Sequence, residues 1–144
     1  MTFGDLKFQI DMLLTSDNVL PKDNDKVKAA LKLAYIEIAD IATPLKWLTT
    51  NQAEDIMRLA TGGYFVRMPA MPVGTDSVDI NDVELDIDSE LVPAVARMMA
   101  GYIAKEVNTK QYHRALAVEL MKKYDAKVRE FMLSTQPDEG FTNA

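Results

Sequence analysis

The sequence predicts a mainly α protein, a bundle of four to five helices with a small antiparallel β ribbon between helices three and four. Apolar residues recur every three or four positions along most of the chain, which is the period of an amphipathic helix. One acidic stretch, residues 78–87, instead alternates apolar and acidic residues, as a strand does. At 144 residues one domain is expected. We place the helical domain at 1–133, with the ribbon, or arm, at about 62–88 and a flexible C-terminal tail at 134–144.

The first two helices follow from capping residues and apolar spacing. Helix one is predicted from Gly4 to about Leu14, before the turn-rich residues 15–18. Helix two begins after a cap at Asp23 or Asn24 and ends near Ala42, because the residue before a proline avoids the helical conformation. It carries an apolar seam at Val27, Leu31, Ala34, Ile38 and Ile41. More apolar residues widen this seam beyond one face, so we expect helix two either to be central to the core or to contact a second chain.

The middle of the chain predicts a short helix and then the arm. Asn51 and Glu54 resemble a capping box for a helix over 52–60, which Gly62 and Gly63 end. Residues 64–68 read as a strand. In the acidic run the alternation changes parity at 81–82, which indicates a bulge or tight turn within a ribbon of two or three strands. The acids are expected on the exposed face of this ribbon.

The last two helices are predicted to form an αα-hairpin. Asp88 is a suitable N-cap for the fourth helix, which runs to about Val107, with Pro93 in its first turn. The fifth helix follows residues 108–109 and runs to about Phe131. The short link between them makes the two helices neighbours.

Composition limits the classes of function. The hydrophobic share of 48% and the charged share of 26% are typical of a soluble globular protein. The net charge of −6 argues against general affinity for nucleic-acid backbones. Without cysteine there are no disulfides, thiolate metal sites or cysteine nucleophiles. The most apolar later stretch, residues 91–104, is too short to span a bilayer, and we expect a protein that is used without export and without a membrane.

We find no pattern that specifies an enzyme. Asp79, Asn81 and Asp82 lack the central glycine and the final glutamate of a calcium loop, which favours a solvated strand face over a metal site. His113 is the only histidine and has no ligand partner one turn away, so we expect it at the surface or at an interface. Nucleophile motifs of the Gly-x-Ser-x-Gly kind are missing. We therefore expect no catalytic residue, metal site or cofactor. An enzyme using the acids of residues 79–88 with a divalent metal ranks well below the non-enzymatic readings.

Charge is distributed unevenly. Residues 105–129 carry seven bases and three acids, whereas residues 76–90 carry seven acids and no base. Two solvated faces would explain this, since exposed ion pairs contribute little to stability. The functional reading is head-to-tail association, in which the acidic arm of one subunit meets the basic hairpin of the next and closes a ring. The candidate interface residues are Asp79, Asp82, Glu84 and Asp86 on the arm, Arg114, Lys122, Lys123 and Lys127 on the hairpin, and Arg67, Met68 and Met71 in a partner-facing loop.

Three segments resemble the head–tail adaptors of tailed bacteriophages, also called connector or head-completion proteins. They are the N-terminal KAALKLAYIEIADIATPLKW, the segment YFVRMP followed by VDINDVELDIDSEL, and the helical VPAVARMMAGYIAKE with HRALAVELMKKYDAKVREF. The resemblance implies a virion structural protein assembled in the host cytoplasm and forming a homo-oligomeric ring, usually of twelve subunits, beneath the portal protein. The arm would reach a neighbour or the downstream tail component. The tail with Phe141 would dock on the portal. DNA would pass nearby without specific binding, because an acidic lumen lets it slide. The alternative is a small non-enzymatic helical protein-binding or regulatory module, monomeric or dimeric, with the seam over residues 27–41 as its partner groove.

Overall fold

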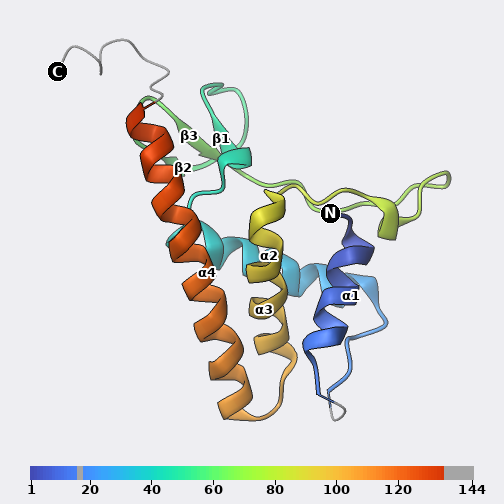
Figure 1. The fold of residues 1–144 in the computed structure, drawn as a ribbon. Coiled ribbons are helices and arrows are strands. Elements are labelled where there is room, and N and C mark those ends of the chain that lie inside the picture. Colours follow the sequence, from blue (N-terminus) through green and yellow to red (C-terminus); the bar gives the residue numbers. More distant parts are fainter. Residues whose placement is uncertain (16–17, 135–144) are drawn as a thin grey trace.

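The computed structural model describes residues 1–15 and 18–134, and the predicted tail beyond Ser134, including Phe141, lies outside them. The described part contains the α-helices α1 (Phe3–Leu13), α2 (Asn24–Ile41), α3 (Val92–Ile103) and α4 (Val107–Ser134) (Figure 1). It also contains a three-stranded antiparallel sheet. The mainly α fold with a small β element is confirmed.

The N-terminal helices begin where the sequence predicts. Thr2 and Asp5 form a reciprocal capping box at the start of α1, and the side chain of Asp23 accepts the Asp25 N–H at the start of α2. Both arrangements satisfy backbone N–H groups that lack a partner within the helix. Most of the apolar seam of α2 is buried in the core, at Val27, Leu31, Ala34 and Ile38. Helix α2 is therefore central to the core, and the seam is not free to serve as a partner groove.

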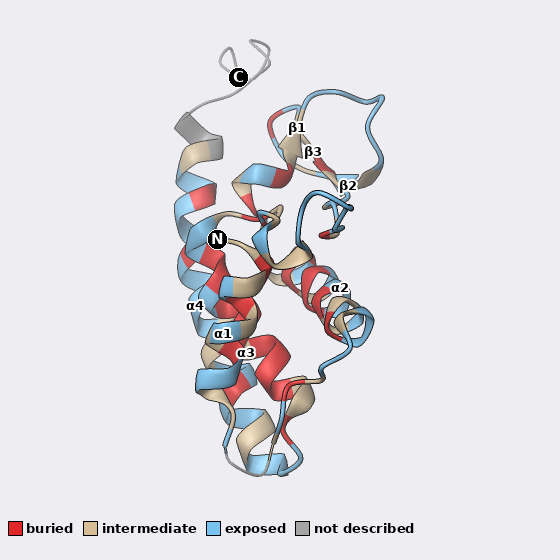
Figure 2. Cartoon of the chain, turned by 90° about the vertical axis from the view of Figure 1, so that its right-hand side faces the viewer, coloured by how far each residue is buried: buried red, intermediate tan, exposed pale blue. Residues whose placement is uncertain are grey.

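Helices α3 and α4 form the predicted hairpin and run antiparallel (Figure 1). Eight of the twelve residues of α3 are buried (Figure 2), including Met98 and Met99, which were predicted to lie in the core. The two helices pack closely at Gly101, where an added Cβ would lie 3.4 Å from the carbonyl oxygen of Lys110, at van der Waals contact. Helix α3 ends at Ile103, four residues earlier than predicted.

The sheet is built from residues 48–67, in the order β1 (Leu48–Thr49), β3 (Phe65–Arg67) and β2 (Ile56–Leu59). The predicted helix over 52–60 is wrong, although β3 confirms the strand predicted at 64–68. Gly62 and Gly63 have φ angles of 73° and 81° and turn β2 back onto β3. Consecutive left-handed glycines are typical of a tight hairpin turn. The side chain of Asn51 accepts the Ala53 N–H in a turn and caps no helix.

The acidic run does not form the predicted ribbon. Residues 73–84 form an extended loop that contains the short 3₁₀ helix η2 (Ile80–Asp82), with one isolated bridge between Thr2 and Glu84. Helix η2 lies where the parity of the alternation changes. The alternation that follows arises because Leu85 and Ile87 are buried in the core, whereas Glu84 is exposed and Asp86 is partly buried in an ion pair. An extended chain packed on helices has the same two-residue period as a paired strand.

Two further 3₁₀ helices, η1 (Leu45–Trp47) and η3 (Ser89–Leu91), complete the fold. The Asp88 side chain makes no capping hydrogen bond, contrary to prediction, and η3 precedes α3. Its carboxylate instead accepts hydrogen bonds from the Lys46 N–H and the Tyr124 hydroxyl, which joins η1 to α4.

Candidate interaction surface

The acidic arm, defined here as residues 73–84, projects from the body of the protein (Figure 1). Residues 73–79 are all exposed. Hydrogen bonds within its tip nevertheless fix its shape: the Thr75 N–H donates to the Val78 carbonyl at 2.9 Å, and the Val78 N–H donates to the Thr75 hydroxyl at 3.0 Å. The legs of the arm touch, because a Cβ at Gly74 would lie 3.1 Å from the Ile80 nitrogen. The arm is thus an ordered element without a core of its own.

The first residues of the chain hold one end of the arm. The Phe3 N–H donates to the Val83 carbonyl and the Leu85 N–H to the Met1 carbonyl, both at 2.9 Å. The Met1 amino group pairs with Glu84 at 2.9 Å. Gly4 lies against the arm so closely that a Cβ there would be 2.9 Å from the Asn81 carbonyl oxygen. These contacts fix the direction of the arm relative to α1.

An ion pair ties the chain after the arm to the sheet. The Arg67 guanidinium donates to both carboxylate oxygens of Asp86, at 2.6 and 2.7 Å, and the Ala70 N–H also donates to Asp86 at 2.7 Å. Burial raises the pKa of Asp86, but these hydrogen bonds and the charges of Arg67 and Lys46 outweigh it and hold the pKa below its usual value. The sequence placed Asp86 and Arg67 on surfaces that meet partners. The structure pairs them with each other, because an isolated charge at a partly buried position is costly.

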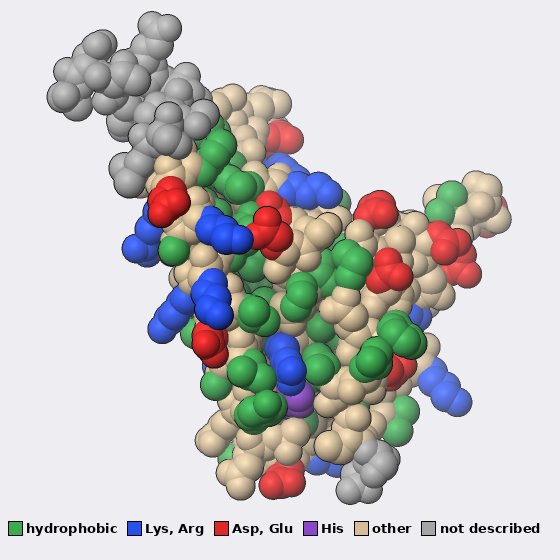
Figure 3. All heavy atoms as spheres, in the orientation of Figure 1, with side chains coloured by type: hydrophobic (Ala, Val, Ile, Leu, Met, Phe, Trp, Pro, Cys, Tyr) green, Lys and Arg blue, Asp and Glu red, His purple; other side chains and the backbone are tan. Residues whose placement is uncertain are grey.

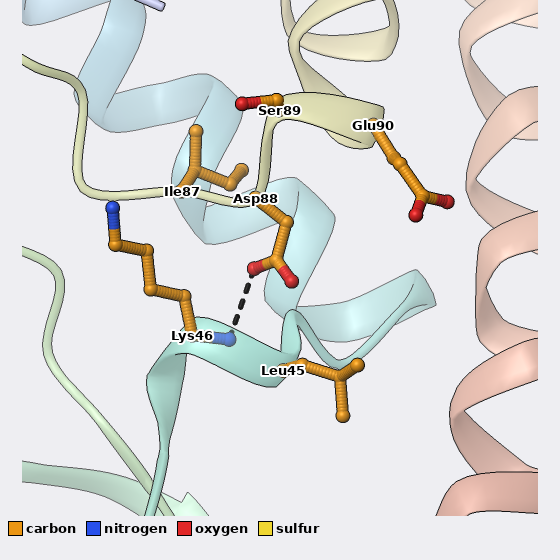
Figure 4. Close-up of a pocket in the computed structure, with 6 residues that line it drawn as sticks. All are labelled: Leu45, Lys46, Ile87, Asp88, Ser89 and Glu90. Carbon is orange, nitrogen blue, oxygen red and sulfur yellow. Dashed lines mark hydrogen bonds between the residues drawn. The ribbon is translucent and has the colours of Figure 1, made fainter.

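A pocket of about 500 Å³ lies beside this junction (Figure 4). It is lined by Leu45, Lys46, Ile87, Asp88, Ser89 and Glu90. The Asp88 carboxylate is occupied by the Lys46 N–H at 2.9 Å and the Tyr124 hydroxyl at 2.5 Å, and the same hydroxyl accepts the Leu45 N–H at 2.9 Å. These bonds make Asp88 a structural junction. Among residues 1–15 and 18–134, no three histidine or acidic side chains come together as a metal site would require.

The four acids of the arm, Asp76, Asp79, Asp82 and Glu84, are exposed. Asp79 and Asp82 have no ion-pair partner in the described part of the chain, and Glu84 pairs with the Met1 amino group. They lie together on the projecting part of the molecule, where acidic side chains gather in Figure 3. A group of like charges without counter-charges does not stabilise its own fold.

The basic hairpin divides into paired and unpaired charges. Arg114 forms an ion pair with Glu37, and Lys127 forms one with Glu90 at 3.3 Å. Lys122 and Lys123 are exposed, without an ion pair among the described residues. Of the four predicted interface bases, these two are therefore free to meet a partner.

The loop after β3 is partly apolar surface. Met68 is 44% exposed, and Met71 packs partly buried against the core. Both line a small cavity of about 30 Å³ together with Tyr35, Ile36 and Met57.

His113 was predicted at the surface or at an interface, but it is buried between α3 and α4 of the same chain. Its Nδ1 atom lies 3.1 Å from the Arg97 guanidinium. Burial and the positive charge of Arg97 both lower its pKa. The predicted hairpin implied contact between α3 and α4, but the face of α4 that holds His113 depends on how the helices are rotated against each other.

An apolar surface on α1 was not predicted from the sequence. Phe8 and Met12 are 66% and 71% exposed, one turn apart. In Figure 3 hydrophobic side chains gather over α1, α3 and α4 on the face toward the viewer. The signal was present, because Phe8 and Met12 lie off the core-facing positions of α1 while being as apolar as the core residues.

Comparison of the chain with protein-family models, curated proteins and solved structures gave no match in any of the three. Within the described residues, no helix has the length and apolar character needed to cross a lipid bilayer. The geometry of the arm and of its surroundings therefore carries the functional argument.

Proposed function

We propose that this protein is a virion structural protein, a head–tail adaptor that forms an oligomeric ring joining the portal protein to the tail around the DNA channel. The observation that carries the proposal is the acidic arm. It is ordered by its own hydrogen bonds, anchored at its C-terminal end, exposed along residues 73–79, and acidic without internal counter-charges. An ordered, exposed and acidic element of this kind is suited to contact with another molecule.

The position of the arm supports the proposal of a ring. The arm projects from one side of the chain, and its acids would repel those of a second arm, so the receiving surface on an identical chain is a different one. Such heterologous contacts close into rings when the rotation between subunits allows. Charges at the contact fix orientation and partner choice more than affinity.

The remaining elements fit supporting roles in this assembly. The α3–α4 hairpin, whose first helix is two-thirds buried, supplies a rigid wall. The portal protein and a downstream tail component are the proposed partners, with the virion as the location, and Phe141 in the C-terminal tail as a portal contact. A net charge of −6 keeps the ring from gripping DNA that passes through it.

Imaging with a portal protein tests this proposal. The full chain is mixed with the portal protein of the same phage, and the particles are examined by negative-stain electron microscopy. We expect portal particles that carry an added collar at one end. Portal particles that remain bare, at protein concentrations well above those of the portal, would contradict the adaptor function.

A further inference from the structure

A groove between α1 and α3 carries the next inference. Its volume is about 260 Å³, and it is lined by Gln9, Met12, Leu13, Pro93, Ala96 and Arg97. One water molecule occupies about 30 Å³ of the liquid, so the groove has room for an apolar side chain. Met12 in its wall is 71% exposed, and Phe8, one helical turn before Met12 on α1, is 66% exposed. Contiguous apolar surface of this kind on a soluble protein marks an interaction site.

Arg97 supplies the charge of this groove. Its guanidinium lies 3.1 Å from Nδ1 of His113 and 5.8 Å from the centroid of the Tyr112 ring. It has no carboxylate partner among the described residues. The groove therefore combines an apolar wall with an unpaired cation.

The acidic arm has the complementary composition. Val73 and Val78 are 63% and 43% exposed near its tip, beside Asp76 and Asp79. Neither acid has an ion-pair partner in the described part of the chain. Apolar side chains next to carboxylates match an apolar wall next to an arginine.

The arm of the same chain does not fill the groove. Its base is fixed beside residues 1–4 at the start of α1, whereas the α1 residues of the groove are 9–13. Its tip points away from α1 (Figure 1).

We infer that the acidic arm of one copy seats in the α1–α3 groove of the next copy, with Val78 against the apolar wall and an arm carboxylate on Arg97. This inference rests on the proposed ring and names its contact. It replaces the basic hairpin as the receiving surface, because Arg114 and Lys127 are already paired within the chain and Lys122 and Lys123 offer charge alone.

Cysteine cross-linking tests the inference directly, because the chain has no native cysteine. Full-length Met12→Cys protein and mass-tagged Val78→Cys protein are mixed under assembly conditions with portal protein and mildly oxidised. The matched control mixes tagged Val78→Cys with Lys122→Cys, which places the second thiol on the exposed surface of α4. Mass photometry of each mixture, with and without portal protein, reports assembly independently of the cross-link.

We expect the tagged heterodimer to form at least tenfold more with Met12→Cys than with Lys122→Cys. If the particles assemble but cross-link equally in both mixtures, mainly through Lys122→Cys, or in neither mixture, the groove contact is wrong. The proposal of a ring would be unaffected by these results. Monomers throughout, with no cross-link, would overturn the ring and the groove together. An Arg97→Glu variant gives a second measurement: assembly should weaken at least tenfold and recover when Asp79→Arg is added to the same chain. Unchanged assembly of Arg97→Glu would contradict the groove contact.

Discussion

Arg67 on β3 and Asp86 at the end of the acidic run form a bidentate ion pair, with nitrogen–oxygen distances of 2.6 and 2.7 Å. Their side chains are only 20% and 17% exposed. The Arg67 guanidinium also donates to the Lys46 carbonyl at 2.8 Å, and the Trp47 indole N–H donates to the Asp86 carbonyl at 2.5 Å. The pair therefore ties the sheet, η1 and the chain that leaves the arm into one unit.

Removing the charge of Asp86 should destabilise the fold. The Asp86→Asn variant leaves the Arg67 guanidinium without its counter-charge, and hydrogen bonds to charged groups contribute about 1.5–3 kcal/mol. We expect the free energy of unfolding, measured with urea, to fall by about 2 kcal/mol. The matched control is Asp82→Asn on the exposed arm, which should change it by less than about 0.5 kcal/mol. Equal effects of the two substitutions would show that the ion pair does not hold the junction.

The Asp86 carboxylate should also make the stability of the protein depend on pH in the acidic range. The pKa of Asp86 is lower in the folded protein than in the unfolded chain, so its contribution is complete above the ordinary carboxyl pKa of about 4. That contribution disappears as the pH falls through the lowered folded pKa, because the unfolded state binds the proton more readily. Urea midpoints at pH 6, 4 and 3 should therefore decline more steeply for the unaltered protein than for Asp86→Asn. Parallel declines would contradict this assignment.

His113 predicts a separate dependence in a higher range of pH. Burial and Arg97 lower its pKa, so the folded protein takes up a proton less readily than the unfolded chain. The contribution of neutral His113 to the free energy of unfolding should be fully present above about pH 6.5. It should decrease as the pH falls toward 5.5, by at most about 1.4 kcal/mol per pH unit. A His113→Gln variant should lose this decrease. If its unfolding free energy changes with pH as much as that of the unaltered protein, another group is responsible.

A substitution at Gly4 should displace the base of the arm. A Cβ in the Gly4→Ala variant would lie 2.9 Å from the backbone oxygen of Asn81, so the arm must shift. We expect a loss of about 1–3 kcal/mol in unfolding free energy, as for other overpacked sites. Faster proteolysis within residues 73–84 should accompany it. Gly101→Ala is the control, since its nearest atom is 3.4 Å away and alanine favours a helix by about 1 kcal/mol. A tolerated Gly4→Ala would show that the arm is not fixed against α1.

Local signals predicted the helices, whereas the β element and the surroundings of the site depended on distant contacts. Asp23 and the apolar period of α2 act within a few residues, so the start and the core face of that helix were readable. The partial capping box at Asn51 wrongly predicted a helix over residues 52–60, because the glycine turn at 62–63 favours pairing of β2 with β3. Alternation in the acidic run indicated an extended chain, but not whether a strand or a helix would lie beside it.

The candidate site was predictable in outline only. The excess of acid in the arm is a property of composition and was visible in the sequence. The pairing of Arg67 with Asp86 joins residues 19 positions apart and required the sheet to be in place. The α1–α3 groove with Arg97 depends on how helices far apart in the chain pack, which periodicity does not specify.

The most direct test of the central claim is the particle mass of the full chain as a function of salt, with and without portal protein. We predict particles of many times 16.1 kDa that dissociate as salt rises, because screening weakens charged contacts. An Asp76→Asn, Asp79→Asn, Asp82→Asn variant should assemble less and respond less to salt. A single 16.1 kDa species under every condition, or a variant that assembles as the unaltered protein does, would contradict the role of the arm as a contact between subunits.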